Sequence, residues 1–182
     1  MNWPNRLTLL RVLLIPVCLV LLSIETDLCQ LLALIVLILA AMTDWLDGYL
    51  ARRYHLVTSF GKFLDPVADK MLVLSVMIAL CGLGRFPAWA CVIVLFRDLA
   101  VDGLRLVAIQ QGHVIAAGPL GKIKTTLQLV TLVVFLMKNR PFSPFPMDQV
   151  LLVITMMMTL ISGVDYFVRN RAVLAGSEEK AL

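Results

Sequence analysis

The sequence predicts an all-α integral membrane protein, with six transmembrane helices in one membrane-embedded domain over residues 1–182. Of the 182 residues, 60% are hydrophobic and 15% are charged, and the mean hydropathy is +0.92. A soluble domain is about half apolar and about a quarter charged. The apolar residues also form long continuous runs, without the two-residue alternation of a half-buried strand. These observations exclude an ordinary soluble domain and a disordered chain.

Six uncharged runs give the expected helices in order. The first run, 12–24, lacks the small-residue cleavage pattern of a signal peptide, so we expect an uncleaved first helix over 6–24. Every run is shorter than the roughly 20 residues that a span needs, so charged residues must lie at or inside the helix ends. Breakers such as Gly84, Pro87 and Gly112 mark the connections. The other helices are expected over 28–53, 61–83, 86–110, 120–138 and 147–169.

The basic residues predict the orientation in the membrane. Six spans place both termini on one side, and 13 of the 16 Lys and Arg residues fall on that side; the other three are Arg85, Lys138 and Arg140. Basic residues are enriched on the cytoplasmic side of membrane proteins. We therefore expect both termini in the cytoplasm and a multi-pass protein of the cell membrane. The net charge of +4 is explained in the same way and predicts no nucleic-acid partner.

Four of the twelve acidic residues lie within 26 residues: Asp44, Asp47, Asp65 and Asp69. Positions 44 and 47 share one face of a helix, and so do positions 65 and 69. Two antiparallel helices with a short connection would therefore direct four carboxylates into one space. Acids within a membrane are costly and repel each other, so a cation must compensate them.

The ligand set at this point contains only oxygen, which suits hard cations such as Mg²⁺, Mn²⁺ or Ca²⁺. Four carboxylates are enough for two ions, the arrangement used for phosphoryl transfer. Structural alternatives exist for single residues. Asp65 before Pro66 also fits a helix N-cap, and Asp44 or Asp47 could form an ion pair with Arg52 or Arg53 at the interface.

The stretch from Asp44 to Asp69 reads D-x2-D-G-x2-A-R-x8-G-x3-D-x3-D. It resembles the signature of the CDP-alcohol phosphotransferase family, with all eight fixed positions filled. The rest of the chain resembles one branch, the CDP-diacylglycerol–glycerol-3-phosphate phosphatidyltransferases. The segments that carry this second resemblance are Asn5-Arg-Leu-Thr8-Leu-Leu-Arg11, Arg97-Asp98 and Gly121-Lys122-Ile-Lys124-Thr125-Thr-Leu-Gln128.

The resemblance implies an enzyme that transfers a phosphatidyl group from CDP-diacylglycerol to glycerol 3-phosphate and releases CMP. It also implies two divalent cations, Mg²⁺ or Mn²⁺. Asp44 and Asp65 would bridge both ions, Asp47 would bind one and Asp69 the other, and Asp69 would also be the catalytic base. The residues expected to line the CDP-lipid site are Asn5, Thr8, Gly48, Ala51, Arg52, Thr58 and Gly61. The family is commonly dimeric, so a homodimer is expected.

The acceptor is predicted from other charges. Arg97, Arg105, Lys122 and Lys124, with Thr125, fall on the expected cytoplasmic halves of the fourth and fifth helices. A basic pocket there suits an acceptor that carries a phosphate. Lys124 equally suits simple anchoring at the cytoplasmic surface. Asp98 and Asp102 are available as partners for Arg97 or Arg105.

Other acceptors and one other class of protein stay open. Inositol phosphate fits the same charges, whereas serine would not require them, and phosphatidylglycerol is a further acceptor for this chemistry. Acids within a membrane also mark the ion paths of channels and transporters. A conduction path should place acids at more than one depth, whereas all four lie at one expected membrane face.

Overall fold

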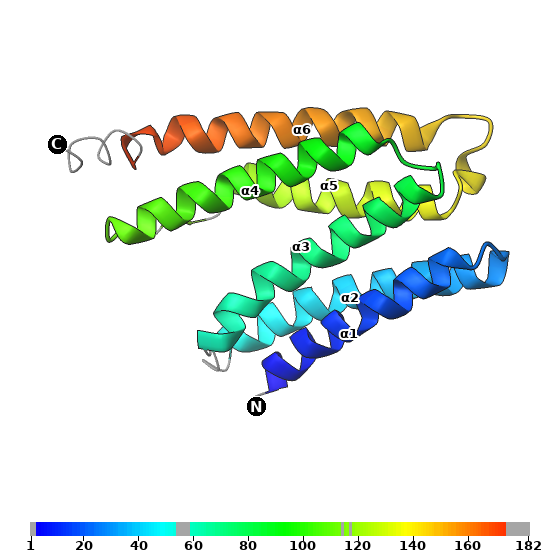
Figure 1. Cartoon of the computed structure of the whole chain (residues 1–182), viewed down its shortest axis with the longest axis horizontal. Coiled ribbons are helices and arrows are strands. Elements are labelled where there is room, and N and C mark those ends of the chain that lie inside the picture. Colours follow the sequence, from blue (N-terminus) through cyan, green and yellow to red (C-terminus); the bar gives the residue numbers. More distant parts are fainter. Residues whose placement is uncertain (1–2, 54–58, 114, 117, 174–182) are drawn as a thin grey trace. The chain divides into compact units, whose positions relative to one another are not determined.

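The computed structural model of the chain is all-helical over the residues that it describes, which are 3–53, 59–113, 115–116 and 118–173 (Figure 1). Within these ranges the side chains of 3–6, 44–53 and 59–66 lie outside the description. The helices are α1 (Trp3–Ser23), α2 (Asp27–Arg53), α3 (Ser59–Gly82), α4 (Ala88–Gln110), α5 (Pro119–Leu136), η1 (Arg140–Phe142) and α6 (Met147–Arg169).

All six expected helices are present, and their ends lie within three residues of the predicted ones. The sequence did not predict the short 3-10 helix η1, which begins after Asn139 in the left-handed region (φ 55°). Both α5 and α6 are long and apolar enough to cross a membrane, and α1 and α2 contain shorter apolar helical stretches, Leu7–Ser23 and Asp27–Thr43. The prediction of an all-helical fold is confirmed over the described residues, and two of its helices are long and apolar enough to cross a membrane.

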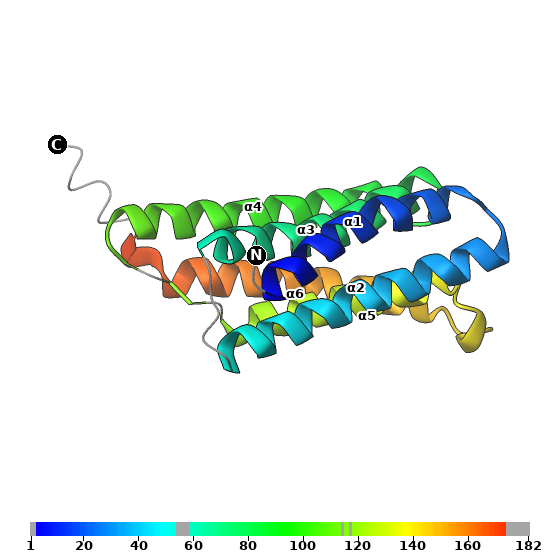
Figure 2. The ribbon, with the colours of Figure 1, turned by 90° about the horizontal axis from the view of Figure 1, so that it is seen from below.

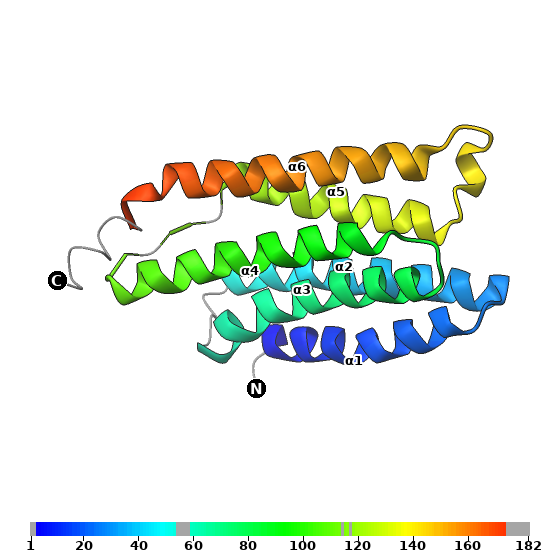
Figure 3. The ribbon, with the colours of Figure 1, turned by 45° about the horizontal axis from the view of Figure 1, so that its top comes forward.

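The described chain divides into two compact units, and the first holds α1, α2, α3 and residues 132–146. Within it α1 packs against both α2 and α3, and α2 also contacts α3. The helices alternate in direction, with α1 and α2 joined at one end by the short segment 24–26 (Figures 2 and 3). Their buried faces form a core of aliphatic side chains that includes Leu22, Leu37, Leu72, Val76 and Leu80.

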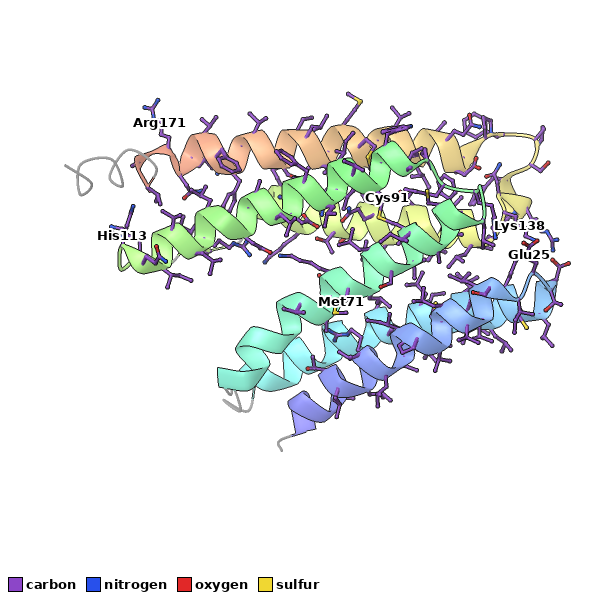
Figure 4. All side chains as sticks on the ribbon, in the orientation of Figure 1. Glu25, Met71, Cys91, His113, Lys138 and Arg171 are labelled. Carbon is purple, nitrogen blue, oxygen red and sulfur yellow. The ribbon has the colours of Figure 1, made fainter. Side chains whose placement is uncertain are left out.

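One end of this first unit gathers the three basic residues that the sequence assigns to the non-cytoplasmic side. Arg140 and Lys138 both pair with Asp27 at the start of α2, at 2.9 and 3.4 Å. Arg85 donates to the backbone carbonyls of Phe135 and Leu136 at the end of α5. Figure 4 shows Glu25 and Lys138 at this end of the unit. The acidic segments of α2 and α3 are at the opposite end, because α2 runs away from Asp27.

The second unit consists of α4, α5 as far as Thr131, α6 and the residues that follow α6. α4 and α6 pack together, and Val101, Leu104 and Tyr166 form a buried cluster between them. Thr131 of α5 and Thr155 of α6 share a buried hydrogen bond of 2.7 Å between their hydroxyls. His113 and Arg171 lie at the same end of this unit (Figure 4).

The outer face of α6 is apolar and exposed. The exposed apolar residues of this face repeat at helical spacing, so they form one continuous surface. An exposed apolar surface of this length is typical of a helix that faces lipid. Its residues are Val153, Met157, Leu160, Val164 and Val168.

Candidate functional site

The four aspartates occupy the connected ends of α2 and α3 in the first unit. Asp44 and Asp47 lie in the second half of α2, and Asp65 and Asp69 in the first half of α3. The two helices contact each other, and only residues 54–58 separate them. The two acidic segments therefore lie on helices that contact each other and follow closely in the chain.

The N-cap interpretation of Asp65 is wrong. α3 begins at Ser59, so Asp65 and Pro66 both lie inside the helix rather than at its start. An aspartate inside a helix has no free backbone N–H groups to cap. Helix capping therefore does not account for the carboxylate at this position.

The structure describes only part of the predicted nucleotide and metal site. Asp69 is half-buried beside the fully buried Ala68, and Thr8 of α1 is buried as well. Thr58 lies outside the described residues. For the other predicted residues the structure describes only the helix in which each lies; these residues are Asn5, Asp44, Asp47, Gly48, Ala51, Arg52, Gly61 and Asp65.

The donor set fits a hard divalent cation. Among the side chains that the structure describes, no three His, Cys, Asp or Glu residues converge as metal ligands. Three of the four aspartates lie outside that search. The acidic segments 44–47 and 65–69 contain neither histidine nor cysteine, so they offer carboxylate oxygens, the ligands that Mg²⁺ and Mn²⁺ prefer.

Arg11 of α1 is a residue of this unit that the sequence did not assign to the site. Its side chain is 0% exposed, and its Nε donates to the carbonyl oxygen of Ala40 on α2 at 3.3 Å. Ala40 lies about one turn before Asp44 on the same helix. In the sequence, Arg11 stands directly before the first apolar run. That position predicted a charge at the membrane surface rather than a buried one.

In the second unit, the predicted acceptor residues Arg97 and Lys124 converge on one carboxylate. Lys124 of α5 donates from Nζ to both carboxylate oxygens of Asp98 on α4, at 2.8 and 2.9 Å. Arg97 donates from Nη1 to the same carboxylate at 3.1 Å. The Lys124 side chain is only 3% exposed. A lysine that anchors the chain at the membrane surface would instead face solvent.

The other predicted acceptor residues are arranged differently. Arg105 donates from Nε to the hydroxyl of Tyr166 at 3.0 Å, with its guanidinium carbon 5.4 Å from the centre of that ring. Asp98 is thus the partner of Arg97 and not of Arg105. Lys122 is exposed on α5, and the hydroxyl of Thr125 donates to the carbonyl of Gly121 at 3.1 Å.

Glycine makes room for Arg97. A Cβ added to Gly163 of α6 would lie 3.2 Å from Cγ of Arg97. The Nη2 of Arg97 reaches the hydroxyl of Ser162 on the same helix at 3.1 Å. Arg97 therefore fits against α6 because residue 163 has no side chain.

The chain is similar to known phosphatidyltransferases over nearly its whole length. Residues 1–161 match the CDP-alcohol phosphatidyltransferase family. A Bacillus subtilis protein named CDP-diacylglycerol–glycerol-3-phosphate 3-phosphatidyltransferase is 40% identical over 183 residues, which cover 93% of this chain and 95% of that protein. A Rickettsia typhi protein of the same name is 37% identical over 169 residues, which cover 91% and 95%. The chain therefore belongs to the CDP-alcohol phosphatidyltransferase family.

Proposed function

We propose that this protein transfers the phosphatidyl group of CDP-diacylglycerol to glycerol 3-phosphate, producing phosphatidylglycerol phosphate and CMP. The observation that carries the proposal is the full-length similarity to relatives named for this reaction. The complete eight-residue pattern on α2 and α3 supports the same chemistry. The family match extends from residue 1 to 161, which favours one catalytic domain that includes both compact units.

In this proposal Asp44, Asp47, Asp65 and Asp69 hold two Mg²⁺ or Mn²⁺ ions. When bound, the ions neutralise negative charge on the diphosphate of the donor. Arg52 donates to phosphate oxygens of the CDP moiety, a task that suits the fixed fork of a guanidinium. Asn5, Thr8, Gly48, Ala51, Thr58 and Gly61 complete the proposed CDP-lipid site.

The reaction exchanges one phosphorus–oxygen bond for another. The hydroxyl oxygen of the acceptor bonds to the lipid-bearing phosphorus, the bond from that phosphorus to the CMP oxygen breaks, and Asp69 takes the hydroxyl proton. A carboxylate placed beside the attacking hydroxyl acts as a general base, which contributes a factor of about 10² to 10⁴ to the rate. CMP departs with the electron pair of the broken bond.

Glycerol 3-phosphate is the acceptor that best suits the second unit. Arg97, Arg105, Lys122 and Lys124, with Thr125, are the residues proposed to bind its phosphate. Arg97 and Lys124 share a single carboxylate, so this trio keeps one net positive charge. A serine acceptor has no phosphate that would use such a charge, whereas inositol phosphate would.

The proposal includes six spans, both termini in the cytoplasm and an active site at the cytoplasmic face of the cell membrane. Its support is that the three bases expected on the side away from the termini, Arg85, Lys138 and Arg140, gather at one end of the first unit, opposite the acidic segments. The four aspartates of the pattern lie at one end of α2 and α3, and Asp27 at the other end of α2 is paired with Arg140 and Lys138. This arrangement disfavours a cation channel, which needs available acids along its path. The homodimer stays a prediction, which light scattering of the purified protein will test.

The test is CMP release by the purified protein in lipid nanodiscs that contain CDP-diacylglycerol. We expect CMP when Mg²⁺ or Mn²⁺ and glycerol 3-phosphate are both added, and none when the cation is chelated. If no acceptor from a panel of glycerol 3-phosphate, inositol phosphate, serine and phosphatidylglycerol supports CMP release, the enzyme proposal is wrong.

A further inference from the structure

The carboxylate of Asp98 joins three helices of the second unit. It accepts both hydrogen bonds from Lys124 of α5 and one from Arg97 of its own helix, α4. Arg97 continues the connection to Ser162 of α6, and the Ser162 hydroxyl donates to the carbonyl of Thr159 at 3.1 Å. The side chains of Lys124, Asp98 and Arg97 are 3%, 10% and 14% exposed.

A buried ammonium depends on such a partner. Removing a charge from water is expensive, and loss of one member of a buried ion pair leaves the other uncompensated. Asp98 therefore compensates the buried charge of Lys124 and holds its side chain in place. It also orients the Arg97 guanidinium, whose Nε has no hydrogen-bond partner among the described residues.

We infer that Asp98 is a positioning residue of the acceptor site, which holds Lys124 and Arg97 as a fixed, charged pair for the phosphate of glycerol 3-phosphate. The inference rests on the proposed function. Two cations and one anion leave a net charge of +1, which attracts a phosphate. Long cationic side chains that are already ordered lose less conformational entropy when the ligand binds. Asp98 itself does not contact the substrate.

The experiment compares four variants of the full chain in nanodiscs: Asp98→Asn, Lys124→Gln, the double variant with both changes, and Asp165→Asn as the matched control. Asp165 also pairs with an arginine of the second unit, Arg169 at 2.7 Å, but that pair is at the surface. For each variant we would measure the KM for glycerol 3-phosphate, the KM for CDP-diacylglycerol, kcat and the thermal midpoint.

Asp98→Asn should raise the KM for glycerol 3-phosphate about tenfold or more. Without the carboxylate, Lys124 is no longer held in place, and its charge-assisted contact with the phosphate is lost. The KM for CDP-diacylglycerol should stay within about twofold, and Asp165→Asn should match wild type. The double variant separates positioning from stability. Its two neutral side chains can hydrogen-bond, so the thermal midpoint should return toward wild type while the KM for glycerol 3-phosphate stays high.

Two results would overturn the inference alone: an unchanged KM for glycerol 3-phosphate in Asp98→Asn, or a double variant that regains both stability and the wild-type KM. If Asp98→Asn does not fold, the double variant and Asp98→Glu supply the same comparison, and Asp98→Glu should show the smaller rise in KM because it keeps the charge. A wild-type protein that uses serine and not glycerol 3-phosphate would overturn the proposed acceptor as well.

Discussion

Arg11 of α1 donates a hydrogen bond to the carbonyl oxygen of Ala40 on α2, 3.3 Å away, from a side chain that is completely buried. Ala40 is about one helical turn before Asp44. The contact therefore brings a permanent positive charge to the part of α2 where the acidic segment begins. Four carboxylates in a membrane protein need positive charge nearby, and α1 contributes some of it from the protein itself.

Arg11→Lys should lower both stability and activity. Lysine has no guanidinium, and its charge lies at a different distance from the backbone. The hydrogen bond from Nε–H to the carbonyl of Ala40 is therefore lost, which lowers the free energy of unfolding by about 2 kcal/mol. We expect a lower thermal midpoint in detergent and CMP release reduced about tenfold or more. Arg169→Lys is the control, since Arg169 is exposed. Similar thermal midpoints and similar CMP release in the two variants would show that the burial of Arg11 does not affect function.

Asp69→Asn should abolish most turnover while metal binding persists. The amide keeps a carbonyl oxygen as a metal ligand but cannot accept the proton of the acceptor hydroxyl. The expected fall in kcat is about 10² to 10⁴, with Mn²⁺ binding followed by electron paramagnetic resonance. Asp27→Asn is the control because Asp27 lies at the other end of the first unit. Turnover near the wild-type rate with metal bound would remove Asp69 as the base.

Arg105→Ala and Lys122→Ala should weaken acceptor binding more than donor binding. Arg105 is held by the hydroxyl and ring of Tyr166, and Lys122 is exposed. The expected result is a KM for glycerol 3-phosphate raised about fivefold or more, with a smaller change in the KM for CDP-diacylglycerol. Tyr166→Phe keeps the ring beneath Arg105 and should have an intermediate effect. An unchanged acceptor KM in both alanine variants would contradict the assignment.

Gly163→Ala should displace Arg97. The new methyl group would lie 3.2 Å from Cγ of Arg97, which is closer than carbon atoms normally approach. We expect a raised KM for glycerol 3-phosphate and a lower thermal midpoint. Gly103→Ala on α4 is the matched control, since its methyl group would meet nothing within 4 Å. That substitution should be neutral or stabilise the helix by up to about 1 kcal/mol. Equal effects of the two alanines would exclude close packing on Arg97 as the cause.

The proposed topology can be tested with reporter fusions. Alkaline phosphatase, which is active only outside the cytoplasm, should be active when inserted beside Lys138 between α5 and α6, and inactive when fused after residue 182. The opposite pattern would reverse the orientation. Activity at both sites would mean an even number of spans between them, whereas the six-span arrangement places one span, α6, between the two sites.

The helices could be predicted because they depend on local properties of the chain. Uncharged runs and Gly or Pro breakers determine where each helix lies, and the ends agree within three residues. The acidic pattern was also accessible, since spacing along two connected helices fixes which positions share a face. Asp65 is an exception. An aspartate followed by a proline, here Pro66, is typical of a helix start, but the helix begins at Ser59.

Most of the basic residues could not be assigned to partners, because their partners depend on how the helices pack. Asp98 follows Arg97 directly, so that pair was foreseen, but Lys124 lies 26 positions further along the chain. Arg105 bonds Tyr166, which is 61 positions away and carries no charge that would mark it. Burial of Arg11 is equally a product of packing, since its sequence position indicates a membrane surface.

The central claim is that glycerol 3-phosphate is the acceptor, and competition between acceptors tests it most directly. The purified protein would receive CDP-diacylglycerol, Mg²⁺ and an equimolar mixture of isotope-labelled glycerol 3-phosphate, inositol phosphate, serine and phosphatidylglycerol, followed by mass spectrometry of the lipid product. We predict that the label of glycerol 3-phosphate appears in phosphatidylglycerol phosphate, in amounts equal to the CMP released. A lipid that carries mainly the label of another acceptor would contradict the account.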